Sequence, residues 1–167
     1  MGTRDQAKIV NFDDLTSVTR NATTGAIEAV TLASGITAVV MDGQKNSIVP
    51  RCEMVTVGVY EKFDHEVSIM GMAISPAIKK DLESGKEGRY IIFVENYFKG
   101  TDGNAALEVY GLDTGLELKG IIREPNNADT QGGFQLRFYT DLNKEPRLPA
   151  SLFLTDYATS KAIYDGL

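Results

Sequence analysis

Apolar and polar residues alternate one by one in several separate stretches of this chain, and that alternation most constrains its fold. The clearest stretch covers residues 134–139, where three large apolar side chains are separated by polar ones: Phe134, Leu136 and Phe138. Successive side chains of a β-strand point to opposite faces, so a period of two predicts strands with one buried face. Similar stretches cover residues 27–32, 55–60, 66–74, 107–110 and 116–123. We expect Phe134, Leu136 and Phe138 to be buried.

Most of these strands follow one another through short turns, without regular helical crossovers. One segment breaks the period, because Ser75 is a good N-cap, Pro76 suits a first helical position, and Ile78 and Leu82 lie four residues apart. Gly85 is placed to end this helix. The pattern therefore predicts a mainly β protein with a short helix, folded as an antiparallel β-sandwich or barrel.

The length of 167 residues is ordinary for one domain. We assign residues 26–167 to the β-sandwich or barrel, with the mid-chain helix and a C-terminal helix capped by Thr155. Residues 1–25 are polar and weakly patterned, and they predict an N-terminal arm that orders only against a partner. Within the domain, residues 27–41 read as a hairpin with Gly35 at a position of positive φ, and residues 42–52 as a loop.

Charge and hydropathy exclude some classes of function. The formal net charge is −6, which argues against a general DNA- or RNA-binding protein because phosphate contacts need clustered Lys and Arg. The charge does not exclude a protein that surrounds nucleic acid without binding it tightly, because an acidic surface repels phosphates and lets them slide past. No apolar stretch approaches the ~20 residues that span a bilayer, and we expect no membrane partner.

The residue types that carry catalysis or bind metals are sparse. The chain has one His, His65, which we expect at an exposed hairpin turn, and one Cys, Cys52, which we expect to be an inert thiol. A single Cys permits no intrachain disulfide. The polar loops at residues 102–104 and 126–129 lack the ligand spacing of a calcium loop. We therefore predict no catalytic residue, no cofactor and no metal site.

The segment 42–52 combines a polar stretch with an apolar group that has no obvious place in a strand. Gly43, Gln44 and Asn46 predict a mobile loop, which Ile48 and Val49 then follow. An exposed apolar group in a loop is reasonable when a partner covers it, so these five residues are our candidates for contact between subunits. The alternative is that Ile48 and Val49 pack back on their own core.

Three segments of the second half together resemble a known family. They are GRYIIFVEN at 88–96, EVYGLDTGLE at 108–117 and GGFQLRFYT at 132–140, of which the YGLDTGL hairpin is the strongest element. In this order, over residues 55–154, they resemble bacteriophage tail tube proteins or a related tail or virion ring component. The resemblance rests on strand patterns and turn glycines.

The resemblance implies a β-sandwich or barrel flanked by a helix and assembled as a ring, commonly a hexamer. Rings stack into a tube, other tail or connector proteins bind its ends, and DNA passes through without sequence-specific binding. A sheet of each subunit joins its neighbours around the lumen, and a long hairpin or loop contacts the next ring; here that segment is 27–41 or 42–52. The site of action is the virion tail, and the host cytoplasm during assembly.

Two other interpretations stay open beside the ring subunit. A monomeric β-sandwich that binds carbohydrate or protein predicts exposed aromatic side chains on one sheet face, for which the candidates are Tyr60, Tyr90, Tyr97, Tyr110 and Tyr139. A small enzyme with an acidic site is the third interpretation. The ring subunit is the one we favour.

Overall fold

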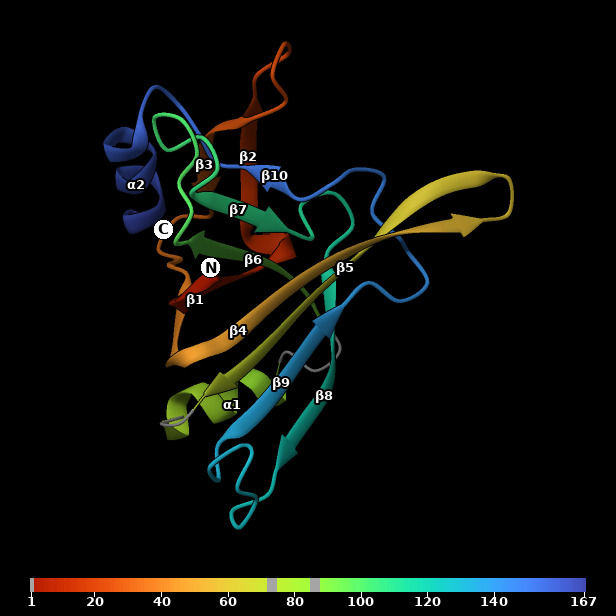
Figure 1. Ribbon diagram of the computed structural model, residues 1–167, viewed down its shortest axis with the longest axis vertical. Coiled ribbons are helices and arrows are strands. Elements are labelled where there is room, and N and C mark those ends of the chain that lie inside the picture. The colour runs from red at the N-terminus through yellow and green to blue at the C-terminus, as the bar shows by residue number, and fades with distance from the viewer. Residues whose placement is uncertain (1, 72–74, 85–87) are drawn as a thin grey trace.

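The computed structural model describes residues 2–71, 75–84 and 88–167, and the chain is mainly antiparallel β-structure with two α-helices in that part (Figure 1). The helices are α1 (Pro76–Ser84) and α2 (Tyr157–Asp165). The strands are β1 (Thr3–Asn11), β2 (Leu15–Arg20), β3 (Ile27–Leu32), β4 (Val39–Val57), β5 (Tyr60–Gly71), β6 (Arg89–Asn96), β7 (Leu107–Tyr110), β8 (Leu116–Arg123), β9 (Phe134–Tyr139) and β10 (Ala150–Ser151). This confirms the predicted fold class.

The main sheet curls until its strands meet again. Its order is β1-β4-β5-β9-β8-β6-β7-β10, and β6 also pairs with β1, so six strands form a barrel-like ring to which β7 and β10 are added. The pairs along this sheet are antiparallel. A separate two-stranded sheet, β2-β3, lies beside it.

The interior of the barrel is the main apolar core. Leu136 and Phe138 of β9 are fully buried there, as predicted, while Phe134 is half-buried. The predicted helix is α1, where Ser75 Oγ accepts from the Ile78 N–H (3.3 Å). Its Ile78 and Leu82 pack against this core. Gly85, predicted to end the helix, lies outside the described residues.

A second apolar cluster lies on the outer face of β6 and β7. It joins Ile91 and Phe93 of β6 with Leu107 and Val109 of β7, and side chains of β2, β3 and α2 pack against it. The predicted C-terminal helix is present as α2, but its N-cap is Asp156 and not Thr155. The Asp156 carboxylate accepts from the Thr159 N–H at 2.8 Å.

The N-terminal segment differs from the predicted arm. Strand β1 lies inside the sheet, between β4 and β6, and β2 pairs with β3. The alternation of β1 is not recognisable in the sequence, because Lys8 is a charged residue at a buried position. Its ammonium donates to the carbonyls of Tyr164 (2.8 Å) and Asp165 (3.3 Å), at the C-terminal end of α2, where carbonyls have no partner within the helix.

The segments 27–41 and 42–52 also differ from their predictions. Gly35 does have a positive φ of 78°. The predicted hairpin does not form, because β3 pairs with the preceding strand β2 and the strand after Gly35 pairs with β1. Strand β4 then runs without a break through 42–52. The pairing of β4 with β5 shifts register between Gly43 and Ile48. The polar residues of this segment therefore mark an irregularity within a strand and not a loop.

Candidate functional site

His65 lies in β5 and is buried, which corrects its predicted place at an exposed turn. Its Nδ1 accepts from the Gly111 N–H (3.1 Å), and its Nε2 lies 2.8 Å from the Arg147 carbonyl oxygen, to which it donates. Both ring nitrogens are thus engaged in a neutral imidazole that ties three segments together. Burial lowers the pKa of His65, against the opposing effect of Glu145.

The thiol of Cys52 lies where its reactive form is disfavoured. Cys52 is half-buried in β4, and burial raises the pKa of its thiol, with Asp64 and Glu108 adding to the rise. A raised pKa disfavours the nucleophilic thiolate. Within the described residues, no group of three or more His, Cys, Asp or Glu side chains is placed to hold a metal ion.

The tyrosines do not gather on one exposed face. Tyr90 and Tyr110 are buried, and Tyr139 is half-buried at the end of β9. Tyr60 and Tyr97 are exposed on different elements. Tyr60 begins β5 and Tyr97 follows β6. The arrangement expected of an aromatic carbohydrate-binding face is therefore not present among these five residues.

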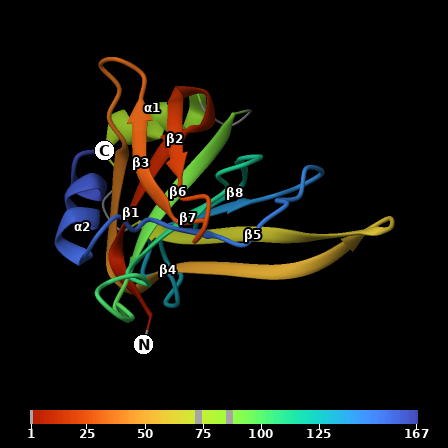
Figure 2. The ribbon, with the colours of Figure 1, turned by 90° about the horizontal axis from the view of Figure 1, so that it is seen from above.

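The most prominent surface feature is the far half of the β4–β5 hairpin. It projects well beyond the rest of the molecule as a two-stranded ribbon (Figures 1 and 2). Val57 pairs with Tyr60 across a two-residue turn at Gly58, whose φ is 63°. The ribbon exposes four large apolar side chains: Met54 (63%), Val57 (40%), Val59 (87%) and Tyr60 (69%). Exposed apolar side chains gathered on a protruding ribbon indicate a contact surface.

One edge of this hairpin has free backbone groups. In an antiparallel pair, residues alternate between bonding across the pair and pointing away from it. Phe63 of β5 points away, because it exchanges both backbone hydrogen bonds with Glu145 (2.8 and 3.0 Å). Its partner Met54 must therefore direct its own N–H and C=O to the opposite, outer side. On that side β1 pairs with β4 only as far as Asp42, and no other backbone group of the described residues bonds to Met54.

The opposite margin of the same four strands, β4-β5-β9-β8, is also open. Strand β8 pairs with β6 only at Leu116 and Glu117, although it pairs with β9 up to Arg123. Among the described residues no backbone partner occupies the β6 side of residues 118–123. Ile121 and Ile122 are 46% and 47% exposed there. We refer to β4-β5-β9-β8 as the open-edged sheet.

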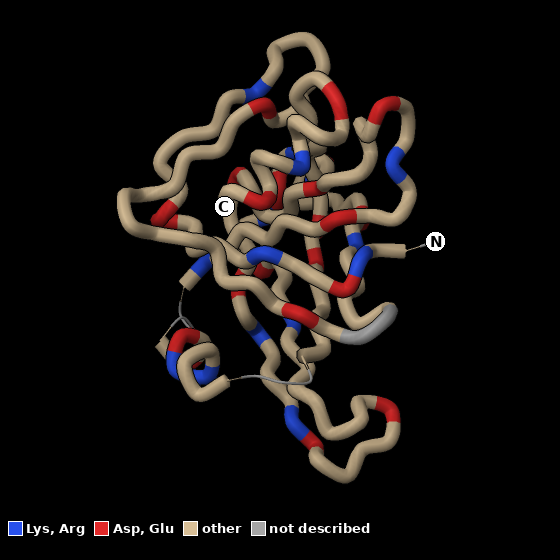
Figure 3. Tube along the Cα trace, turned by 90° about the vertical axis from the view of Figure 1, so that its left-hand side faces the viewer, with Lys and Arg blue, Asp and Glu red and all other residues tan. Residues whose placement is uncertain are grey.

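The solvent face of the open-edged sheet carries charges of both signs in close pairs. Arg137 lies 2.8 Å from Glu66, Arg51 lies 2.6 Å from Glu53, and Lys119 lies 2.9 Å from Glu117. Figure 3 shows basic and acidic positions interspersed along the chain. Exposed pairs of this kind add little stability, but they leave little unbalanced positive charge on the face.

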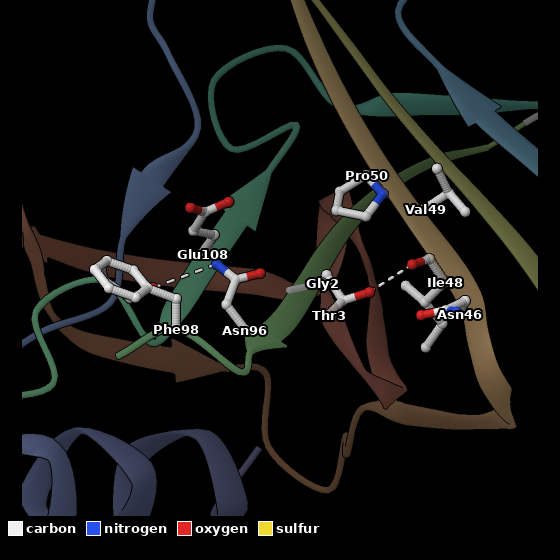
Figure 4. Close-up of a pocket in the computed structure, with 10 residues that line it drawn as sticks. Gly2, Thr3, Asn46, Ile48, Val49, Pro50, Asn96, Phe98 and Glu108 are labelled. Carbon is white, nitrogen blue, oxygen red and sulfur yellow. Dashed lines mark hydrogen bonds between the residues drawn. The ribbon is translucent and has the colours of Figure 1, made fainter. Parts of the chain in front are cut away.

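A groove of about 430 Å³ lies beside β4, near the start of β1 (Figure 4). Its lining comes from the start of the chain and β1, from β4, from the end of β6 and the chain after it, and from β7: Gly2, Thr3, Asn46, Ile48, Val49, Pro50, Asn96, Phe98, Ala105 and Glu108. Thr3 Oγ1 donates to the Ile48 carbonyl across it. Val49 and Phe98 are 54% and 57% exposed, so much of the accessible wall is apolar.

The groove includes three of the five residues predicted to contact another subunit. Asn46 and Val49 are exposed in it, but Ile48 is 2% exposed and packs on its own core, as the alternative interpretation has it. Gly43 lies in β4 outside the groove, and Gln44 is also in β4, with a side chain outside the described part. As contacts between subunits, sequence reasoning missed Met54 and Tyr60, although it named Tyr60 for the monomeric binding module. The signal was apolar residues on both faces of residues 54–60.

No protein-family model, no curated protein and no solved structure matches this chain. Among the described residues, neither helix has the length and apolar character needed to cross a membrane.

Proposed function

We propose that this chain is a structural subunit of a bacteriophage tail tube, or of a related ring in the virion tail. Copies of the chain join side by side into a ring, hexameric by the resemblance, and rings stack into a tube that conducts DNA. Other tail or connector proteins are its further partners, and the host cytoplasm is where it assembles. The proposed role is structural and not catalytic.

The observation that carries the proposal is the pair of open margins on the open-edged sheet. An exposed strand edge is a template for pairing with another chain, and monomeric proteins usually protect it with charge, proline or cover. Here β4 and β8 carry exposed apolar side chains beside their charged ones, among them Met54 and Ile122. Pro50 lies within the open stretch of β4, which continues past it to Val57, so it protects only its own position on that edge.

The directions of the two edge strands suit addition of one copy to the next. Successive strands of the open-edged sheet are antiparallel, so β4 and β8 run in opposite directions. Joining β4 of one copy to β8 of the next therefore continues the antiparallel order. The contact uses two different surfaces, and such head-to-tail contacts produce closed rings or open filaments.

Substitution of Met54 by proline is expected to abolish assembly while the subunit stays folded. Proline removes the N–H that Met54 directs to the open side, and no hydrogen bond of the hairpin depends on that N–H. Met54→Ala is the matched control, because it trims the same side chain and keeps the N–H. Light scattering after size-exclusion chromatography, with negative-stain microscopy, measures assembly, and circular dichroism measures folding.

Rings or tubes from the wild type and Met54→Ala, with monomers from Met54→Pro, support the proposal. A wild-type chain that stays monomeric at high concentration contradicts it. Equal assembly of all three proteins would show that rings form without this strand edge.

We also expect assembled protein to retain almost no duplex DNA in a gel-shift assay at physiological salt. Non-specific DNA binding rests on cations free to replace counterions, with typical Kd values of about 10⁻⁴–10⁻⁶ M. Three cations on the solvent face of the open-edged sheet instead lie close to carboxylates: Arg51, Arg137 and Lys119. Binding that is tight and falls steeply with added salt would contradict a passive channel lined by this face.

A further inference from the structure

Two apolar features of the surface, one convex and one concave, lie far apart on the same strand. The convex one is the tip of the β4–β5 hairpin, where Val57, Val59 and Tyr60 are exposed. The concave one is the groove beside Val49. A strand rises about 3.4 Å per residue, so Val49 and the turn at Gly58 are separated by roughly 30 Å. The tip therefore does not reach the groove of its own chain.

The charges beside the two features are complementary. Lys62 pairs with Val55 and lies on the same ribbon face as Val57 and Tyr60, because alternate residues share a face. Glu108 lies on the groove wall, where it accepts from the Tyr110 hydroxyl (2.7 Å). Within the described part of the chain, neither Lys62 nor Glu108 has an oppositely charged side chain within ion-pair distance.

We infer that the groove receives the hairpin tip of a second copy of this chain. Val57, Val59 and Tyr60 contact the walls that Val49 and Phe98 form, and Lys62 pairs with Glu108. This inference rests on the proposed function and adds the contact that joins one ring to the next. It replaces the predicted contact segments 27–41 and 42–52 by two defined surfaces, one of which contains Asn46 and Val49.

The geometry also fixes how the contact propagates. Tip and groove are different surfaces of one chain, so every copy that donates its tip still offers a free groove. The contact therefore builds a series of copies and not a closed pair. Docking removes the exposed apolar side chains of the tip, Val57, Val59 and Tyr60, from water, and this burial favours the contact.

Exchange of the two charges tests the pairing. Lys62→Glu and Glu108→Lys are each expected to raise the protein concentration needed for tube formation by at least about tenfold, because each places like charges together. The double variant restores opposite charges and is expected to assemble within about threefold of the wild-type concentration. Lys80→Glu on α1 is the control, since it makes the same charge change at an exposed site away from both surfaces.

A cross-link supplies a readout that does not depend on charge. In a Cys52→Ser background, Val49→Cys combined with Val59→Cys is expected to give a ladder of disulfide-linked species on a non-reducing gel, while either cysteine alone gives at most dimers. Absence of the ladder in assembled tubes, or failure of the double charge variant to recover, overturns the tip-in-groove contact but leaves the tube proposal standing. A wild-type chain that never assembles overturns both.

Discussion

Replacing Leu136 by alanine is expected to lower the free energy of unfolding by about 2–5 kcal/mol. Leu136 is fully buried in the centre of β9, between β5 and β8, where it pairs with Ile69 and Ile121. Truncation removes apolar contacts and leaves a cavity, because the neighbouring strands are fixed by their hydrogen bonds and cannot collapse into the space. Denaturant unfolding followed by circular dichroism measures the change.

Leu142→Ala is the matched control for this substitution. It removes the same atoms from a side chain that is 89% exposed, in the loop between β9 and β10. Its expected effect lies within about 0.5 kcal/mol of zero, as for most surface substitutions. A loss from Leu136→Ala no larger than that of Leu142→Ala would mean that β9 presents its other face to the core.

Local sequence pattern was sufficient for the strands whose two faces differ. Leu136 and Phe138 alternate with polar residues, and the inward face follows directly from that period. The start of α1 was equally readable, because Ser75 and Pro76 act through local geometry. In both cases the signal and its physical cause lie within a few residues of each other.

The elements that could not be predicted depend on distant partners. Lys8 reads as an exposed polar residue until the carbonyl of Tyr164, far along the chain, is seen to accept from it. The local sequence does not predict that β3 pairs with β2, because the pattern of a strand does not identify its partner strand. Glycine and proline made β4 resemble a loop, and only the open edge explains why Pro50 is tolerated there.

The candidate site was predictable only in outline. The apolar group at Ile48 and Val49 was correctly noticed, but Ile48 is core and only Val49 lies exposed in the groove. A hairpin was predicted here from strands 55–60 and 66–74, but its turn was placed between them, whereas the structure turns at Gly58 and continues as one strand from Tyr60. Its projection depends on where β1 and β9 stop pairing with β4 and β5. Those end points are a property of the whole barrel, so residues 54–60 alone do not reveal them.

Acidification from pH 7 to pH 5 is expected to destabilise the protein through His65. Burial holds the pKa of this imidazole below its ordinary value near 6.5, so the folded chain resists a proton that the unfolded chain takes up. The stability that His65 contributes is therefore complete above the unfolded pKa and is lost as pH falls below it. The loss is at most about 1.4 kcal/mol per pH unit for one group. Protonation also ends the bond that Nδ1 accepts from Gly111.

His65→Gln isolates this contribution, because glutamine does not titrate and still offers a donor toward the Arg147 carbonyl. The variant is expected to be less stable at pH 7 by about 1–3 kcal/mol, since it leaves the buried Gly111 N–H without its acceptor. Its stability is expected to fall less steeply than that of the wild type between pH 6.5 and pH 5, as denaturant unfolding at each pH measures. Parallel curves for the two proteins would assign the acid sensitivity to other groups. A shallower curve for the variant would identify His65 as the group that ties the Gly111 turn and the Arg147 loop to β5 only while it is neutral.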